Sequence, residues 1–193
     1  MQDPIKLMKH WLMQEKETPN QFPLGAVLST TSSTGSPRSR VIGTMLDSEG
    51  IPKFHTSPGS RKISDIEHNH QVSLTYPLQC RLRSISLEGK LSLLSENELR
   101  EDWLKYSDDF RKHYLVFGAI SGSPIDSLHD LRQQRDALPK KAEQFMPSSF
   151  IGYKFSSITR IAFYEVLPGD FAEAKVFHFD ESRGEWQLSL VAP

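Results

Sequence analysis

Apolar and polar residues alternate along both ends of the chain, as they do in strands with one buried face. The first part carries this alternation over 24–31, 38–46 and 51–57, and short stretches rich in Ser, Gly, Pro and Asp separate these segments. Such stretches form tight turns between antiparallel strands. We therefore expect three strands that follow one another as a meander.

The same alternation predicts six further strands, at 71–76, 81–94, 150–156, 158–166, 175–180 and 185–191. Within 81–94, Arg83, Ile85 and Leu87 share one face because successive side chains point to opposite sides of a strand. The last two strands are joined by "ESRG", which is typical of a hairpin turn.

A helical period predicts helices at 3–17, 60–69, 126–138 and from 95 to about 106. Asp3 and Ser60 stand at N-cap positions, and Ser95 with Glu98 has the spacing of a capping box. The segment "FRKHYLVF" fits a packed helix better than a nucleic-acid-binding face. Strands at both ends with helices inserted indicate an α+β fold built on a barrel or sandwich, as a single domain over residues 1–193.

Composition and charge narrow the function. The chain has 193 residues and a formal net charge of −1, so no global field attracts a nucleic acid. Its single cysteine, Cys80, and the lack of an 18-residue apolar run favour a cytoplasmic protein without a membrane span. His68 and His70 have no evident third ligand, so we expect no metal site. The nucleotide motifs GxGxxG and GxxxxGK[ST] are absent.

Cations stand at an unusual place in the predicted 60–69 helix. Arg61 and Lys62 occupy its first turn, where the helix already carries a partial positive charge. Arg40 lies within an apolar strand, and Thr56 ends the strand before the helix. Arginine, hydroxyl and helix N–H groups together suit a phosphate dianion. The alternative is that Arg61 and Lys62 are solvated surface charges and that Arg40 belongs to an edge strand.

Several motifs in order resemble the pyridoxamine 5′-phosphate oxidase group of FMN-binding split barrels. The resemblance runs nearly end to end through "DPIKLMKHWL", "STTSSTGSPRSRVI", "FHTSPGSRK", "ISLEGKLSLLSENE", "GYKFSSITRIAFYE" and "GEWQLSLVAP". It implies an antiparallel split β-barrel with flanking helices. It also implies the cofactor FMN and a homodimer with FMN at the subunit interface.

The resemblance also assigns cofactor contacts. The phosphate would be held by Arg40, Thr56, Ser60, Arg61 and Lys62.

Five other positions correspond to family contacts with the flavin ring system. Val41 and Ile42 would lie along the isoalloxazine through their backbone, and His55 stands where the family usually has tyrosine. Ser84 replaces the usual glutamine, and Tyr164 replaces the tryptophan that reaches the flavin from the partner subunit.

Departures from the family concern the substrate. Met45 stands where the family has a lysine for the substrate phosphate, and the clamp of Tyr, Arg and Ser has no clean counterpart near Trp103 and Arg111. The family's Ser-x-Gln-Ser flavin contact is missing around "SGSPIDS", and its Arg-Leu-His-Asp-Arg segment falls on "AEAKV", with Lys175 as the only cation.

Three functions are compatible with this pattern. The first is an FMN-dependent oxidoreductase with a small substrate other than pyridoxine phosphate, for which the residues name no catalytic group. The second is a divergent pyridoxine/pyridoxamine 5′-phosphate oxidase in which Lys175 or Arg111 replaces the missing ligands. The third is a flavin- or haem-binding split barrel without turnover. A protein that binds no cofactor is the remaining alternative.

Overall fold

The computed structural model describes residues 3–192. Among these, one compact unit, unit 1, comprises 3–54, 65–92 and 154–192, and a second, unit 2, comprises 55–64 and 93–153. The two units are described separately. The expectation of a single domain over residues 1–193 stays a prediction.

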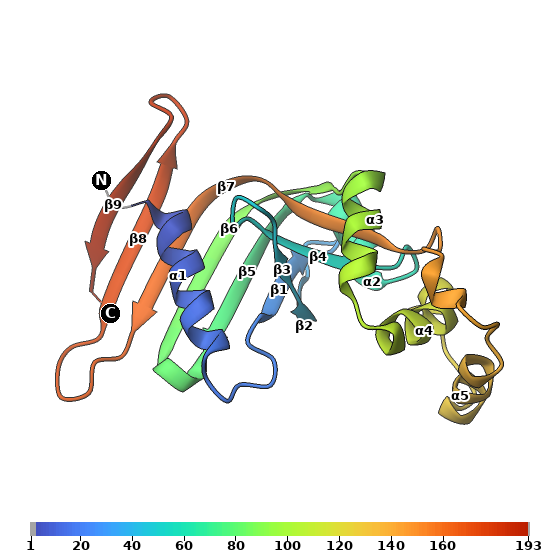
Figure 1. Cartoon of the computed structure of the whole chain (residues 1–193). Coiled ribbons are helices and arrows are strands. Elements are labelled where there is room, and N and C mark those ends of the chain that lie inside the picture. The colour runs from blue at the N-terminus through green and yellow to red at the C-terminus, as the bar shows by residue number, and fades with distance from the viewer. Residues whose placement is uncertain (1–2, 193) are drawn as a thin grey trace. The chain divides into compact units, whose positions relative to one another are not determined.

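The described residues form nine strands in one sheet. The strands are β1 Gly25–Thr31, β2 Pro37–Gly43, β3 Met45–Leu46, β4 Pro52–Thr56, β5 Gln71–Leu78, β6 Arg83–Leu93, β7 Ile151–Glu165, β8 Glu173–Asp180 and β9 Glu185–Val191. Their order is β2-β1-β5-β6-β7-β4-β3, with β8 pairing β7 and β9 pairing β8 (Figure 1). The turn at 181–184 joins β8 to β9 as predicted.

The same residues form five α-helices, and the predicted α+β class is confirmed. They are α1 Pro4–Lys16, α2 Arg61–His68, α3 Glu96–Lys105, α4 Asp108–Phe117 and α5 Leu128–Asp136. The carboxylate of Asp3 accepts the N–H of Ile5 at 2.9 Å, which caps α1. Ser95 and Glu98 form the predicted capping box of α3.

The predicted meander of the first three strands is confirmed: β1 pairs with β2, and β3, which lies within the predicted strand 38–46, pairs with β4. β4 also pairs with β7, which the sequence analysis did not foresee. The single strand predicted over 38–46 is interrupted at Thr44. The Thr44 hydroxyl donates to the carbonyl of Leu24 at 2.8 Å and lies 2.9 Å from the hydroxyl of Tyr76. The N–H of Thr44 also donates to the carbonyl of Leu24, at 3.1 Å.

The two strands predicted at 150–156 and 158–166 are one strand, β7. The exposed pair Ser156 and Ser157 resembles a break in the sequence, but both residues run beside β6. The hydroxyl of Ser156 donates to the carbonyl of Lys90 at 3.2 Å. A Cβ on Gly89 would lie 2.1 Å from the carbonyl oxygen of Ser157. The missing side chain of Gly89 thus lets the backbones of β6 and β7 approach closely.

Helix α1 packs on the sheet of unit 1 through its apolar face (Figure 1). The ring of Trp11 meets Phe163 of β7 edge to face at 5.2 Å, and the guanidinium of Arg83 lies 4.5 Å from the Trp11 ring centre. Arg83 also donates to Glu165 at 2.6 Å. Burial of a large apolar side chain such as Phe163 stabilises the fold by about 1.5–3 kcal/mol.

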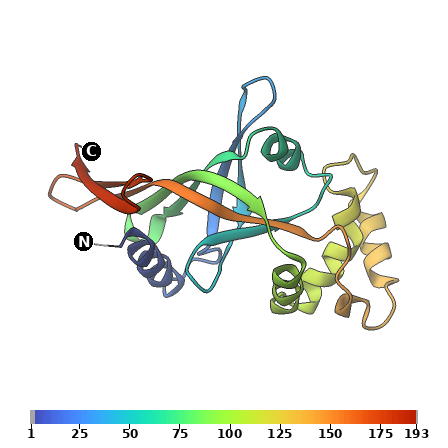
Figure 2. The ribbon, with the colours of Figure 1, turned by 90° about the horizontal axis from the view of Figure 1, so that it is seen from above.

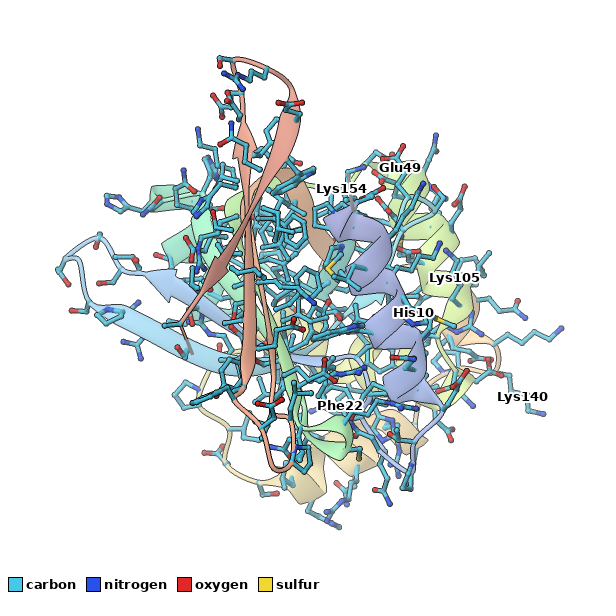
Figure 3. The ribbon with its side chains drawn as sticks, turned by 90° about the vertical axis from the view of Figure 1, so that its left-hand side faces the viewer. His10, Phe22, Glu49, Lys105, Lys140 and Lys154 are labelled. Carbon is cyan, nitrogen blue, oxygen red and sulfur yellow. The ribbon has the colours of Figure 1, made fainter. Side chains whose placement is uncertain are left out.

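Phe22 follows α1 in unit 1. Figure 3 labels Phe22 and also His10, which lies on the exposed face of α1. Its ring occupies the space beside Gly25, where a Cβ would come within 2.2 Å of a ring carbon.

In unit 2, α3, α4 and α5 lie close together (Figure 2). Trp103 of α3, Tyr114 of α4 and Phe150 form a buried aromatic cluster in this unit. No described helix is both long and apolar enough to cross a membrane.

Candidate functional site

The residues predicted to contact the cofactor fall in both units. Unit 1 holds Arg40, Val41, Ile42, Ser84 and Tyr164, and unit 2 holds His55, Thr56, Ser60, Arg61 and Lys62. The geometry of each group is described within its own unit.

Three of the predicted phosphate ligands meet in unit 2, in the Thr56–Lys62 loop that joins β4 to α2. The ammonium of Lys62 donates to the hydroxyl of Thr56 at 3.0 Å and to that of Ser60 at 2.6 Å. Ser60 precedes the first helical residue, Arg61, whose side chain is exposed. The first turn of α2, all of it described, holds no acidic residue. Hydroxyls, two cations and helix N–H groups therefore form a donor set that fits a phosphate.

Tyr114 of α4 fixes the start of this loop. Its hydroxyl lies 2.7 Å from the carbonyl oxygens of Thr56 and Ser149 and 2.7 Å from the hydroxyl of Ser57. Burial raises the pKa of Tyr114 to about 12, although the hydrogen bond with Ser57 lowers it. The phenol is therefore protonated at neutral pH and can donate. The sequence analysis did not identify Tyr114, because the sequence indicated only that it lies in a packed helix.

A second contact fixes the loop through its backbone. A Cβ on Gly59 would lie 2.7 Å from the carbonyl oxygen of Ser121, and one on Gly122 would lie 2.6 Å from that of Gly59. Gly122 also has a φ of +88°, which L side chains rarely adopt. The segment around Gly122 and the Thr56–Lys62 loop therefore pack main chain against main chain.

The side chain of His55 is only 2% exposed. Its Nε2 lies 3.0 Å from Asp102 and its Nδ1 lies 2.9 Å from the hydroxyl of Tyr106, while its ring stacks on Phe150 at 4.8 Å. Asp102 in turn accepts from Lys105 at 2.9 Å. Cofactor contact by His55 stays a prediction, and this geometry favours contact through its backbone.

Tyr106 is protonated beside His55. Burial and the nearby charge of Asp102 raise the pKa of Tyr106 to about 12, with a further contribution from Tyr114. The phenol is thus available as a donor to Nδ1 of His55 at neutral pH.

In unit 1, Arg40 belongs to an ion-pair network. Its Nη1 donates to the hydroxyl of Thr30 at 2.7 Å and to the carbonyl of Leu28 at 3.2 Å, and its Nη2 lies 3.4 Å from Asp65. Arg38 donates to the other oxygen of Asp65 at 2.6 Å. The register of β1 and β2 explains the cluster, because Leu28 stands opposite Arg40 and Thr30 opposite Arg38.

Asp65 is the principal residue that the sequence analysis missed in this network. Burial raises the pKa of Asp65. The hydrogen bond from Thr30 and the charges of Arg38 and Arg40 lower it by more, so the pKa lies below its ordinary value. The available signal was an acid on the apolar face of the predicted 60–69 helix, beside Ile66.

The remaining cofactor predictions fall on less buried positions of unit 1. Val41 is 66% exposed on β2, and its neighbour Ile42 is half-buried. Ser84 is half-buried on β6 opposite Pro77, and Tyr164 is 39% exposed on β7. Their contacts with a flavin stay predictions.

The positions at which the sequence departs from the family's substrate residues are partly or fully buried, or already paired. Met45 is half-buried in β3, and Lys175 of β8 pairs with Glu173 at 2.7 Å. Arg111 forms an ion pair with Asp108 in α4. Trp103 is buried in the core of unit 2, where its Nε1 donates to the carbonyl of Glu143 at 3.0 Å.

No cluster of three or more potential metal ligands occurs in residues 3–192.

We expect Asp65→Asn to lower the free energy of unfolding by about 2–4 kcal/mol at pH 7, because two arginines would lose their buried carboxylate. The native pKa is lowered, so the carboxylate stabilises the fold above its unfolded-state pKa near 4 and loses this effect as the pH falls through the native value. Urea unfolding at pH 7 and near pH 3 measures both effects. A difference between variant and wild type that grows on acidification would contradict this assignment.

Comparison with known proteins identifies the family and the fold. The family model described as pyridoxamine 5′-phosphate oxidase matches residues 16–143. The pyridoxine/pyridoxamine 5′-phosphate oxidase of Klebsiella pneumoniae is 27% identical over 197 residues, covering 99% of this chain and 87% of that protein. The same enzyme of Escherichia coli is 27% identical over 196 residues, with the same coverage.

Two solved structures share the fold. PhzG from Burkholderia lata 383, in complex with tetrahydrophenazine-1-carboxylic acid, has a TM-score of 0.84 and 21% identity, covering 99% of this chain and 93% of its own. A pyridoxamine 5′-phosphate oxidase-related, FMN-binding protein from Nostoc punctiforme has a TM-score of 0.80 and 16% identity, covering 97% and 96%. The predicted split-barrel fold is thus confirmed. The chain belongs to the pyridoxamine 5′-phosphate oxidase-like family of FMN-binding split barrels.

Proposed function

We propose that this protein binds FMN and is an FMN-dependent oxidoreductase for a small substrate other than pyridoxine 5′-phosphate. The Thr56–Lys62 loop carries the proposal, because it offers cations and hydroxyls to a phosphate with no acid in the first turn of α2. Membership of the family supports FMN as the bearer of that phosphate. When bound, FMN accepts a hydride equivalent from a substrate.

The residues of the loop have separate roles in this proposal. Thr56, Ser60 and Lys62 hold the phosphate oxygens by hydrogen bonds, and Arg61 adds a second cation at the start of α2. Tyr114 positions the carbonyl of Thr56 and the hydroxyl of Ser57. Arg40 of unit 1 stays a predicted phosphate ligand, and because its charge is shared with Asp65, its replacement would disturb the fold.

We propose that the substrate lacks a phosphate group like that of pyridoxine 5′-phosphate. Met45 supplies no charge, and the two candidate replacement cations already have acidic partners within their own elements. Lys175 would have to leave Glu173, and Arg111 would have to leave Asp108, before either could bind a substrate phosphate.

A divergent pyridoxine/pyridoxamine 5′-phosphate oxidase is the second candidate. It is supported by the relatives of that name, which match 99% of this chain. A flavin- or haem-binding protein without turnover is the third, supported by phosphate donors that persist where the substrate residues do not.

The double variant Arg61→Ala, Lys62→Ala tests cofactor binding. We expect purified wild-type protein to be yellow, or to become yellow on addition of FMN, and the double variant to bind FMN at least about a hundredfold more weakly. Two charge-assisted bonds to the phosphate, each of about 1.5–3 kcal/mol, would be lost. Titration of FMN followed by quenching of its fluorescence measures the affinity.

The control is Lys6→Ala, Lys9→Ala, which removes two exposed lysines from α1. It should bind FMN as the wild type does, and all three proteins should have the same far-UV circular dichroism. Wild-type protein that stays colourless with excess FMN would refute the proposal. So would equal affinity in the wild type and the Arg61/Lys62 variant.

The substrate assignment is tested by incubating the FMN-loaded protein with pyridoxine 5′-phosphate and measuring pyridoxal 5′-phosphate. We expect turnover at least about a thousandfold below ordinary enzyme rates of roughly 10 s⁻¹. The Escherichia coli enzyme serves as the positive control. Turnover at an ordinary rate would establish the second candidate in place of the first.

We also propose that the protein is a homodimer with FMN at the subunit interface. The family resemblance supports this assembly, as do the exposed apolar side chains of Val41 and Tyr164 in unit 1. We expect light scattering after size exclusion to give twice the chain mass of 22.0 kDa. A single-chain mass at micromolar concentration with FMN bound would contradict the dimer while leaving cofactor binding intact.

A further inference from the structure

A cavity of about 280 Å³ lies between α4 and α5 in unit 2. Its apolar lining comes from both helices: Val116 and Phe117 from α4, and Leu128 and Leu131 from α5. Phe117 and Leu128 remain 36% and 60% exposed, so the two helices leave a space between these side chains that they do not fill. A cavity of about 150 Å³ takes up benzene, so this one has room for a bicyclic ring system.

The polar lining of the same cavity is basic. It consists of His113, Arg132 and Arg135, and none of the described lining residues carries a carboxylate. Arg132 is exposed, and its side chain has no ion pair or hydrogen bond within residues 3–192. An apolar space that opens beside such a guanidinium favours a ligand with an apolar body and a negative end.

His113 and Arg135 are held in place at the border of the cavity. Nη1 of Arg135 lies 3.1 Å from Nε2 of His113, whose Nδ1 lies 2.5 Å from the carbonyl of Asp109. Arg135 also pairs with Asp136 at 2.8 Å. Because a guanidinium can only donate, Nε2 of His113 accepts from Arg135.

A second, polar cavity of about 570 Å³ shares His113 and Arg135 with the first. Its lining also includes three lysines, Lys112, Lys140 and Lys141, and two acids, Asp109 and Asp136. Lys140 extends away from the ribbon in Figure 3. Cations outnumber acids here, so the potential around the apolar cavity is positive on this side as well.

We propose that the α4–α5 cavity binds a small amphipathic carboxylate, with its ring or chain among Val116, Phe117, Leu128 and Leu131 and its carboxylate at Arg132. Inorganic phosphate would leave the apolar lining unused, and a neutral aromatic would leave Arg132 without a partner. The site shares no residue with the Thr56–Lys62 loop. The inference therefore does not depend on FMN binding or on the substrate proposed above.

Calorimetric titration of the FMN-supplied full chain with 2-naphthoate tests this site, with 2-naphthalenemethanol as the neutral counterpart. We expect the naphthoate to bind at least about tenfold more tightly than the alcohol, because only the anion forms a charge-assisted bond with Arg132. Arg132→Gln should remove this preference and leave the affinity for the alcohol unchanged. Arg183→Gln is the matched control, since Arg183 is an exposed arginine of unit 1 and should have no effect.

Leu128→Asp provides a second variant that should fold. Leu128 is 60% exposed, and an acid at the first position of a helix is favourable. Its carboxylate would enter the cavity and should weaken naphthoate binding at least about tenfold. The proposal is overturned if naphthoate does not bind at millimolar concentration, if it binds no better than the alcohol, or if both variants bind it as the wild type does.

Discussion

Asp65 imposes a charge constraint on unit 1. A carboxylate this deeply buried is stable only when hydrogen bonds and cations replace its lost hydration, and Thr30, Arg38 and Arg40 provide them. The positions of both arginines on β2 therefore follow from an acid on α2. Lys62 of unit 2 donates hydrogen bonds to the hydroxyls of Thr56 and Ser60.

Local patterns in the sequence predicted local structure well. The Asp3 cap, the Ser95–Glu98 capping box and the final hairpin each depend on residues a few positions apart, and each formed as predicted. The pairing of β4 with β7 and the continuity of β7 through Ser156 and Ser157 depend on strands far away in the sequence. Alternation alone shows that a segment is a strand, but it does not show beside which strand it lies.

The same division applies to the candidate site. The donors around Lys62 lie within seven consecutive residues, so residue type and spacing were enough to bring them together. The environment of His55 was unforeseen, because Asp102, Tyr106 and Phe150 come from later parts of unit 2. His55 is a polar ring in a buried network with these three residues. The network explains how a residue that departs from the family type can be accommodated.

The contact between Gly59 and Gly122 holds the Thr56–Lys62 loop through main chain rather than side chains at this point. Both sides present main chain, with a carbonyl oxygen where a Cβ would stand. The form of the loop therefore depends on these two positions remaining glycine, and at its start on the side chain of Tyr114. A mutation elsewhere in unit 2 that spares both glycines and Tyr114 leaves these contacts of the loop intact.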